Sequence, residues 1–151
     1  MRLRPLESRD FRHVKEWLED ESLLSLLIVE PPRLDMWFYT YIIELDDGTP
    51  VGWVDIFNVD EINRNAEVGM AIPNGRGRGL SVRVMRRIAR IAFNELGLRR
   101  LTCRILSTNK TALELAPKAG FKREGVQRQA CYQDGRFVDV VVFGMLAEEW
   151  E

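Results

Sequence analysis

The feature that most constrains this chain is a glycine-rich turn leading into an amphipathic helix, NGRGRGLSVRVMRRIARIAF, residues 74–93. Gly77 and Gly79 permit close approach of a ligand to the backbone, or a positive φ, without a Cβ clash. The helix that follows offers unpaired N–H groups and a favourable dipole at its first turn. The sequence therefore predicts an anion site here, most simply for phosphate; the alternative is a tight turn with solvated Arg76 and Arg78.

Three nucleotide- or nucleic-acid-binding templates fit this turn poorly. A P-loop requires a lysine after its last glycine, and none follows here. The dinucleotide fingerprint would place its third glycine at position 80, which is Leu80. A DNA-binding arm rich in Gly and Arg would be free, whereas this turn is held between a strand and a helix.

Composition narrows the function further. The chain has 151 residues, which suits one domain over residues 1–151, with 22 basic and 23 acidic residues and no net basic field for general nucleic-acid binding. Its apolar runs are too short for a membrane span, and the first residues lack a signal-peptide core. Two cysteines and one histidine form no metal pattern, and we expect a cytoplasmic protein without a metal.

Hydrophobic periodicity predicts an α+β fold with a mixed, mostly antiparallel twisted sheet flanked by helices. His13 falls on the polar face of the first helix, so we expect it to be exposed, and we expect Cys103 and Cys131 to pack within strands. The predicted strands are Leu3–Leu6, Trp37–Leu45, Val51–Val59, Ala66–Ile72, Arg100–Leu106, Phe121–Tyr132 and Phe137–Leu146. The predicted helices are Asp10–Asp20, Glu21–Glu30, Leu80–Leu96, ended by Gly97, and Asn109–Ala119, stopped by Gly120.

The helix after the turn also carries a basic stripe. We interpret this stripe as a solvated face, and keep Arg83, in the first turn, as a candidate phosphate ligand. The stripe consists of Arg83, Arg86, Arg87 and Arg90.

Several landmarks in one order resemble the GNAT acyltransferase superfamily, and within it the ribosomal-protein-alanine N-acetyltransferases. They are AEVGMAI, the x-x-G-x-G turn, AFNELGLRRL, Asn109, AGFKREGVQRQA and DGRFVDVVVFGML. Together they cover nearly the whole chain, and the ordered set is more specific than any one motif. The resemblance implies a GNAT-like sheet in which strand Ala66–Ile72 splays from strand Arg100–Leu106, and an acetyl-CoA-dependent N-acetyltransferase.

The resemblance gives the glycine-rich turn a ligand, the pyrophosphate of acetyl-CoA. The family's [QR]-x-x-G-x-[GA] pattern falls on Asn74, Gly77 and Gly79, with Asn in place of the usual Gln or Arg. Backbone groups near Met70 would pair with the pantetheine arm, which Asn109 would also help to hold; Asn109 is equally suited to cap the next helix. The cofactor-binding set implied is Met70, Ala71, Ile72, Asn74, Arg76, Gly77, Arg78, Gly79, Leu80, Ser81 and Asn109.

Amine acetylation requires a base, because a primary amine is mostly protonated at pH 7. Glu67 is the candidate, since the resemblance places it on the strand lining the slot; a solvent-facing glutamate is the alternative. The family's usual general acid, a tyrosine seven residues after the asparagine, is Ala116 here, followed by Pro117, which should kink or shorten its helix. Tyr132, Ser107 or Cys131 could replace it, the thiolate could leave unassisted, or activity could be weak.

The predicted acceptor is a primary amine, such as the N-terminus of a ribosomal protein, attacked directly in a ternary complex. The alternatives are a small-molecule amine, such as a polyamine, an antibiotic or an amino acid, or a catalytically weak CoA-binding regulatory protein. We expect the acceptor to enter near Trp53, Asp55, Phe57 and residues 60–63, where acidic groups would suit a cation; the alternative is ordinary strand packing beside a polar loop. The resemblance leaves room for a homodimer.

Overall fold

The computed structural model describes residues 1–24, 27, 39–73 and 79–150. Its centre is a seven-stranded sheet with the spatial order β1-β2-β3-β4-β5-β7-β6. The strands are β1 (Arg2–Pro5), β2 (Thr40–Glu44), β3 (Pro50–Asp60), β4 (Asn65–Ala71), β5 (Arg100–Leu106), β6 (Lys122–Gln133) and β7 (Arg136–Leu146). Neighbouring strands are antiparallel except β4 and β5, which are parallel. The α+β fold predicted from the sequence is confirmed.

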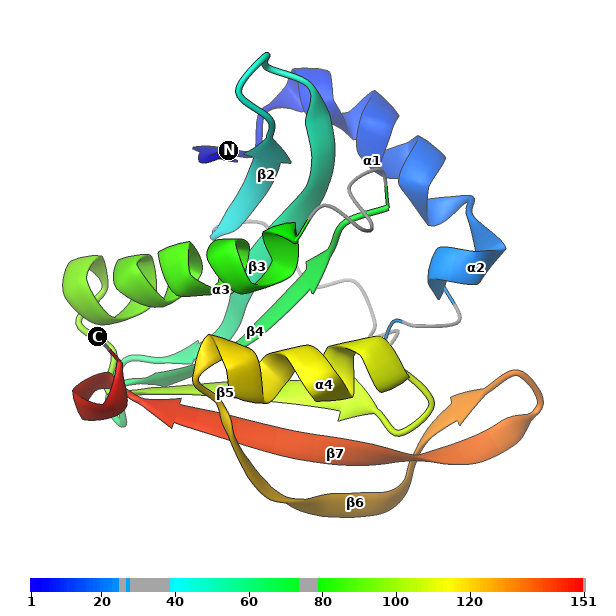
Figure 1. Ribbon diagram of the computed structural model, residues 1–151, viewed down its shortest axis with the longest axis vertical. Coiled ribbons are helices and arrows are strands. Elements are labelled where there is room, and N and C mark those ends of the chain that lie inside the picture. Colours follow the sequence, from blue (N-terminus) through cyan, green and yellow to red (C-terminus); the bar gives the residue numbers. More distant parts are fainter. Residues whose placement is uncertain (25–26, 28–38, 74–78, 151) are drawn as a thin grey trace.

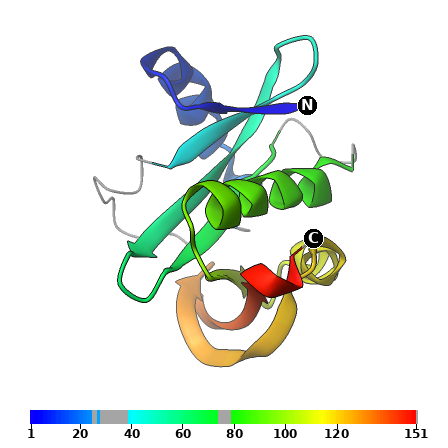
Figure 2. The same cartoon turned by 90° about the vertical axis from the view of Figure 1, so that its left-hand side faces the viewer.

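Helices cover both faces of the sheet (Figures 1 and 2). They are α1 (Phe11–Leu18), α2 (Glu21–Leu24), α3 (Leu80–Arg90) and α4 (Lys110–Ala119), with short 3₁₀ segments η1 (Ser8–Asp10) and η4 (Ala147–Glu149) and a π-helical segment η3 (Ile91–Glu95). The helices α3 and α4 pack on one face, in the main hydrophobic cluster. The helices α1 and α2 pack in a second cluster with residues of the opposite face.

Alternation along β3 assigns its residues to these two faces, because successive strand side chains point in opposite directions. Val54 and Ile56 are fully buried in the cluster beneath α3. Trp53 packs in the cluster that contains α1. By the same alternation Asp55 and Phe57 belong to the α1 face, which is the face on which the candidate site lies.

Helix boundaries differ from prediction at several points. The first helix spans Phe11–Leu18 and not Asp10–Asp20, and the predicted helix Glu21–Glu30 is described as α2 only to Leu24, because most of its remaining residues lie outside the described ones. The helix after the turn is α-helical only to Arg90 and continues as a π-helix to Glu95, before Gly97 adopts a φ of +67°. The prediction that Pro117 kinks or shortens α4 is wrong as regards length, because α4 extends to Ala119. Proline is tolerated so close to the end because Gly120, with a φ of +106°, terminates the helix in any case.

The environment of three other residues can be compared with expectation. Cys103 is buried and Cys131 half-buried, both as free thiols in strands, as predicted. The prediction that His13 is exposed is wrong: its ring is half-buried and stacks on Trp17 at 6.0 Å between centroids. The stack on Trp17, one helical turn further along α1, accounts for this partial burial. Among the described residues, no helix is long and apolar enough to cross a bilayer.

Candidate active site

The parallel strands β4 and β5 are paired over only part of their length. Beyond the last paired residues, both strands continue without pairing to each other, and Figure 1 shows β4 diverging from β5. The paired residues are Asn65–Arg100, Ala66–Leu101 and Glu67–Thr102. The predicted splay is therefore confirmed, and it leaves the β5-facing backbone edge of Met70 and Ala71 without a strand partner in β5.

Glu67 lies at the point of divergence. Its neighbours Ala66 and Val68 are buried in the cluster beneath α3, so alternation places the Glu67 side chain on the α1 face. Across the sheet Glu67 is paired with Phe57 of β3. The side-chain amide of Asn58 donates a hydrogen bond to Oε2 of Glu67.

Asp55 lies on the same face of the sheet as Glu67, two residues before Phe57 on β3. It accepts a hydrogen bond of 2.6 Å from Oγ1 of the buried Thr40. Burial raises the pKa of Asp55 to about 6, against the lowering effect of side-chain hydrogen bonds from Thr40 and Trp53. The surroundings of this carboxylate therefore stabilise its negative charge incompletely.

Asp55 and Glu67 are diagonal neighbours across β3 and β4. Asp55 is paired with Gly69, and Phe57 with Glu67, so the α-carbons of Asp55 and Glu67 are expected roughly 7 Å apart. Gly69 contributes no side chain between them, and a Cβ at this position would lie 3.5 Å from the Phe57 ring. The strand pairing thus brings together two acidic groups and an aromatic ring that the sequence separates by up to twelve positions.

A stack of aromatic rings lies beside these carboxylates. Trp53 of β3 stacks on Trp17 of α1 at 5.8 Å, and Trp17 in turn stacks on His13. Trp17 and Ala71 are buried in the same cluster as Trp53. The stack attaches α1 to the sheet on the face that carries Asp55 and Glu67.

Cys103, a buried thiol on β5, is a poor nucleophile. Burial raises the pKa of Cys103 to about 12, and the negative charge of Glu67 adds to the shift. A thiol that remains protonated at neutral pH does not form a covalent acyl intermediate readily.

Part of the predicted phosphate-binding turn falls within the described residues. Gly79 precedes α3 with a φ of +66°, and among the described residues, its chain neighbours aside, no atom lies within 4 Å of the position its Cβ would take. It provides no side-chain cap for the first turn of α3, which begins with the buried Leu80 and the half-buried Ser81. The predicted anion site at this helix start stays a prediction. The predicted residues Asn74, Arg76, Gly77 and Arg78 lie outside the described residues.

The basic stripe on α3 is exposed, as expected of a solvated face. Arg83 belongs to this exposed set, and its suggested contact with phosphate stays a prediction. The stripe residues are Arg83, Arg86, Arg87 and Arg90.

Asn109 caps α4, as its residue type suggested. Its Oδ1 accepts a hydrogen bond of 3.2 Å from the N–H of Ala112. The expected contact with a pantetheine arm stays a prediction. Ala116, at the family's tyrosine position, is buried in the core and brings no acid to the site.

The three alternative acids predicted from the sequence lie on β6 or after β5. Tyr132 is exposed and forms an edge-to-face pair with Phe137 on the β6–β7 hairpin, which extends beyond α4 in Figure 1. Cys131 packs against a small cluster with Leu106, and Ser107 is half-buried after the end of β5. The positions of these three side chains do not identify any of them as the general acid.

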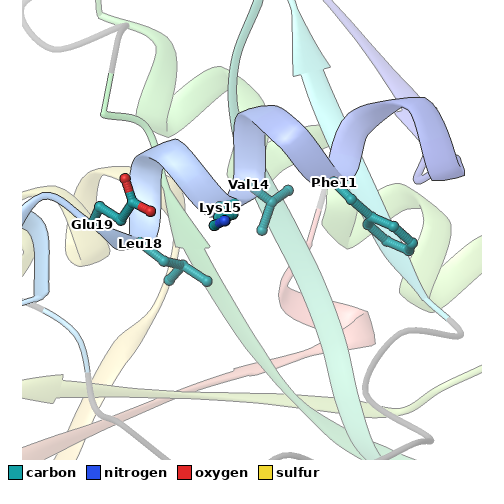
Figure 3. A pocket seen from close by; sticks show the side chains of 5 residues that line it. All are labelled: Phe11, Val14, Lys15, Leu18 and Glu19. Atoms are coloured by element: carbon teal, nitrogen blue, oxygen red, sulfur yellow. The ribbon is translucent and has the colours of Figure 1, made fainter.

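A surface hollow lies apart from the strand residues of the site. It is lined by residues of α1 and by the residue directly after this helix, as Figure 3 shows. Its residues are Phe11, Val14, Lys15, Leu18 and Glu19. Over the part of the chain that the structure describes, no group of three or more His, Cys, Asp or Glu residues is placed to hold a metal ion.

Sequence reasoning missed two residues of this site. Asn58 interrupts the alternation of β3 without any local motif, and only its contact with Glu67 identifies it. Thr40 lies fifteen residues before Asp55 and reaches it through the pairing of β2 with β3. No sequence signal links either residue to its partner.

Comparison with known proteins relates this arrangement to one family. Residues 1–122 match the family described as "Acetyltransferase (GNAT) domain". The chain is 32% identical over 108 residues to a putative ribosomal N-acetyltransferase, YdaF, of Bacillus subtilis, covering 71% of this chain and 59% of that protein's length. It is 24% identical over 155 residues to spermidine N(1)-acetyltransferase of Escherichia coli, covering 93% of this chain and 83% of that protein.

A solved structure shares the fold. The spermidine N-acetyltransferase of Vibrio cholerae, in complex with CoA and spermine, superimposes with a TM-score of 0.89 at 22% identity. The match covers 99% of this chain and 96% of that one. The GNAT-like architecture implied by the ordered motifs is confirmed.

Proposed function

Because the chain belongs to the GNAT acetyltransferase family, we propose that it transfers an acetyl group from acetyl-CoA to the primary amine of a small molecule carrying a second positive charge. The observation that carries this proposal is the pair of carboxylates on the α1 face. Asp55 and Glu67 are diagonal neighbours, on the strands beside the divergence of β4 from β5.

Glu67 is the proposed general base. An amine must lose its proton before it attacks a carbonyl, and a carboxylate within hydrogen-bond reach accepts that proton directly or through water. The position of Glu67 at the last β4–β5 pair puts it beside the expected course of the pantetheine arm. The second carboxylate, Asp55, is then available to bind the acceptor.

Asp55 is proposed to bind the second cation of the acceptor. A carboxylate whose pKa is raised to about 6 by burial is ionised at pH 7.5 at some cost in free energy. An ammonium group beside it removes part of this cost, which favours a dicationic acceptor over a monoamine. The rings of Trp53 and Phe57 on the same face suit the methylene chain of such a molecule.

Acetyl-CoA, when bound, would supply the acetyl group: the amine nitrogen would form the new N–C bond and give up its proton, while the thioester C–S bond would break and CoA would leave as its thiolate. The backbone of Met70, Ala71 and Ile72 would hold its pantetheine arm, with Asn109. The remaining cofactor-binding residues proposed are Asn74, Arg76, Gly77, Arg78, Gly79, Leu80 and Ser81. Direct attack by the amine is supported by the high pKa of Cys103, which makes an acyl-cysteine route unfavourable.

A protein N-terminus is the second candidate acceptor. The relative named as a putative ribosomal N-acetyltransferase favours it. A single N-terminal amine, however, gives no separate partner to Asp55. The whole-protein likeness to the spermidine N(1)-acetyltransferase and the two-carboxylate arrangement both favour the small acceptor.

The test is an acetyl-CoA-dependent thiol-release assay over three acceptor classes: diamines and polyamines, monoamines of equal length, and peptides with a free N-terminus. We expect the diamines to have the highest kcat/KM. Glu67→Gln should lower kcat by roughly 10²- to 10⁴-fold, as expected for loss of a general base. Asp55→Asn should lower kcat/KM for diamines by about tenfold or more and leave matched monoamines unchanged.

Thermal stabilisation by acetyl-CoA is the control, since both variants should retain it. Peptides as the best acceptors would replace the small-molecule proposal with N-terminal acetylation. Absence of thiol release from every acceptor, with thermal stabilisation intact, would support a CoA-binding protein without catalysis.

A further inference from the structure

A bulge in β3 places one extra residue opposite β4, directly beside Glu67. Phe57 is paired with Glu67, and the next pair is Asp60 with Asn65. Two residues of β3, Asn58 and Val59, therefore stand opposite the single residue Ala66. Bulges of this kind bend a strand and change the direction of a side chain, and they are frequent next to active sites.

The backbone of Asn58 adopts the left-handed conformation, with a φ of +50°. Regular alternation would direct the side chain after Phe57 away from Glu67, toward the opposite face of the sheet. The bulge instead brings the Asn58 amide to the Glu67 carboxylate, where Nδ2 donates to Oε2. Asparagine tolerates positive φ better than most residues and also supplies this donor.

We propose that Asn58 is a positioning residue that fixes the Glu67 carboxylate in the orientation required to accept the proton of the acceptor amine. This inference rests on the proposed role of Glu67. The amide engages one carboxylate oxygen, Oε2, and leaves Oε1 for the acceptor.

The chain contains a matched control for the backbone of this residue. Gln129 also has a positive φ, +52°, and lies within an irregularity of β6, between Gln127 and Cys131. Its side chain is exposed, and its backbone N–H donates to Asp139. Replacing it with glycine therefore tests the backbone effect of such a change away from the site.

The experiment compares Asn58→Gly, Asn58→Asp, Gln129→Gly, Glu67→Gln and the double variant Asn58→Gly/Glu67→Gln by kcat, KM and acetyl-CoA thermal shift. Glycine keeps the left-handed backbone and removes the donor, so kcat should fall about ten- to a hundredfold with KM for acetyl-CoA unchanged. Asn58→Asp should lower kcat further, because its carboxylate repels Glu67. Gln129→Gly should retain normal kcat.

The double variant separates positioning from a structural effect. If Asn58 acts through Glu67, Asn58→Gly should cause no further loss in the Glu67→Gln background. An equal loss in both backgrounds, or normal kcat for Asn58→Gly beside a defective Glu67→Gln, would overturn the inference while leaving the proposed function intact. Normal kcat for Glu67→Gln would instead remove the base itself.

Discussion

Two pairs of acidic side chains in this molecule have opposite surroundings. Asp10 and Glu44 are buried against Arg4, which donates two hydrogen bonds of 2.8 Å to Asp10 and one of 2.7 Å to Glu44. Asp55 and Glu67, in contrast, receive hydrogen bonds from the neutral side chains Thr40 and Asn58. Within the described residues neither forms an ion pair.

The pKa values of the first pair follow from this difference. Hydrogen bonding from Arg4 lowers the pKa of Asp10 despite its burial. Burial acts to raise the pKa of Glu44, but hydrogen bonds from Arg4 and Arg2 outweigh it and lower the pKa. Through Arg4, Asp10 and Glu44 connect β1, β2 and the start of α1. Asp55 and Glu67, on the β3–β4 face, have no cationic partner among the described residues. A carboxylate that is neutralised by a cation stabilises the fold, whereas one without a cationic partner can bind a cation or exchange a proton.

The largest effect on stability is expected for Arg4→Met. This change leaves two buried carboxylates without their shared cation, which costs about 3–5 kcal/mol in the free energy of unfolding. Urea denaturation followed by circular dichroism measures it. A loss below about 1 kcal/mol would show that Asp10 and Glu44 do not depend on Arg4 and would remove the contrast between the two pairs.

An intermediate effect of opposite sign is expected for Asp55→Asn. The folded-state pKa of Asp55, about 6, is above its ordinary value of 3.8, so the contribution of this group to stability falls as pH rises from about 4 to about 6. The asparagine variant should therefore be more stable than the wild type at pH 7.5, by on the order of 1–3 kcal/mol. The two proteins should be equally stable near pH 4.

Urea denaturation of both proteins at each pH tests this crossing. Asp10 and Glu44 give stability the opposite pH dependence in both proteins. Because their pKa values are lowered in the folded state, they stabilise the fold at pH values above their unfolded-state pKa values, and this stabilisation is lost on acidification. A variant less stable than the wild type at pH 7.5 would mean that Asp55 is structural like Asp10.

The smallest effect is expected for Arg2→Met. Arg2 donates to Glu44 at 2.6 Å, but its side chain is 66% exposed, compared with 12% for Arg4. Exposed ion pairs contribute about 1 kcal/mol or less. The same urea titration measures the change, and a loss as large as that of Arg4→Met would show that exposure does not separate the two arginines.

Much of the fold was predictable because local patterns and strand order agree. Aromatic and β-branched content, together with turn residues, located every strand among the described residues to within a few positions, and Gly97 and Gly120 marked the ends of their helices. The ordered motifs implied a strand that splays from its parallel neighbour, and the pairing of β4 with β5 does stop at Glu67. These features depend on short stretches of sequence whose periodicity and turn residues are readable without the tertiary structure.

The candidate site was predictable only in part. Glu67 and Asp55 were singled out individually, but their diagonal relation depends on the register of β3 against β4. Asn58 and the π-helical continuation of α3 have no local motif. His13 was assigned to the wrong environment because helical periodicity does not register the reach of a neighbouring tryptophan ring.

The sequence by itself determined the α+β class, the glycine-rich turn before a helix and the acidic residues available for amine chemistry. Only the tertiary structure decided which carboxylates are neutralised by Arg4 and which receive hydrogen bonds from neutral side chains. The physical reason is that residue type fixes the charge a side chain can carry, while strand register, burial and the bulge at Asn58 decide what surrounds it. A carboxylate becomes structural or chemical through those surroundings.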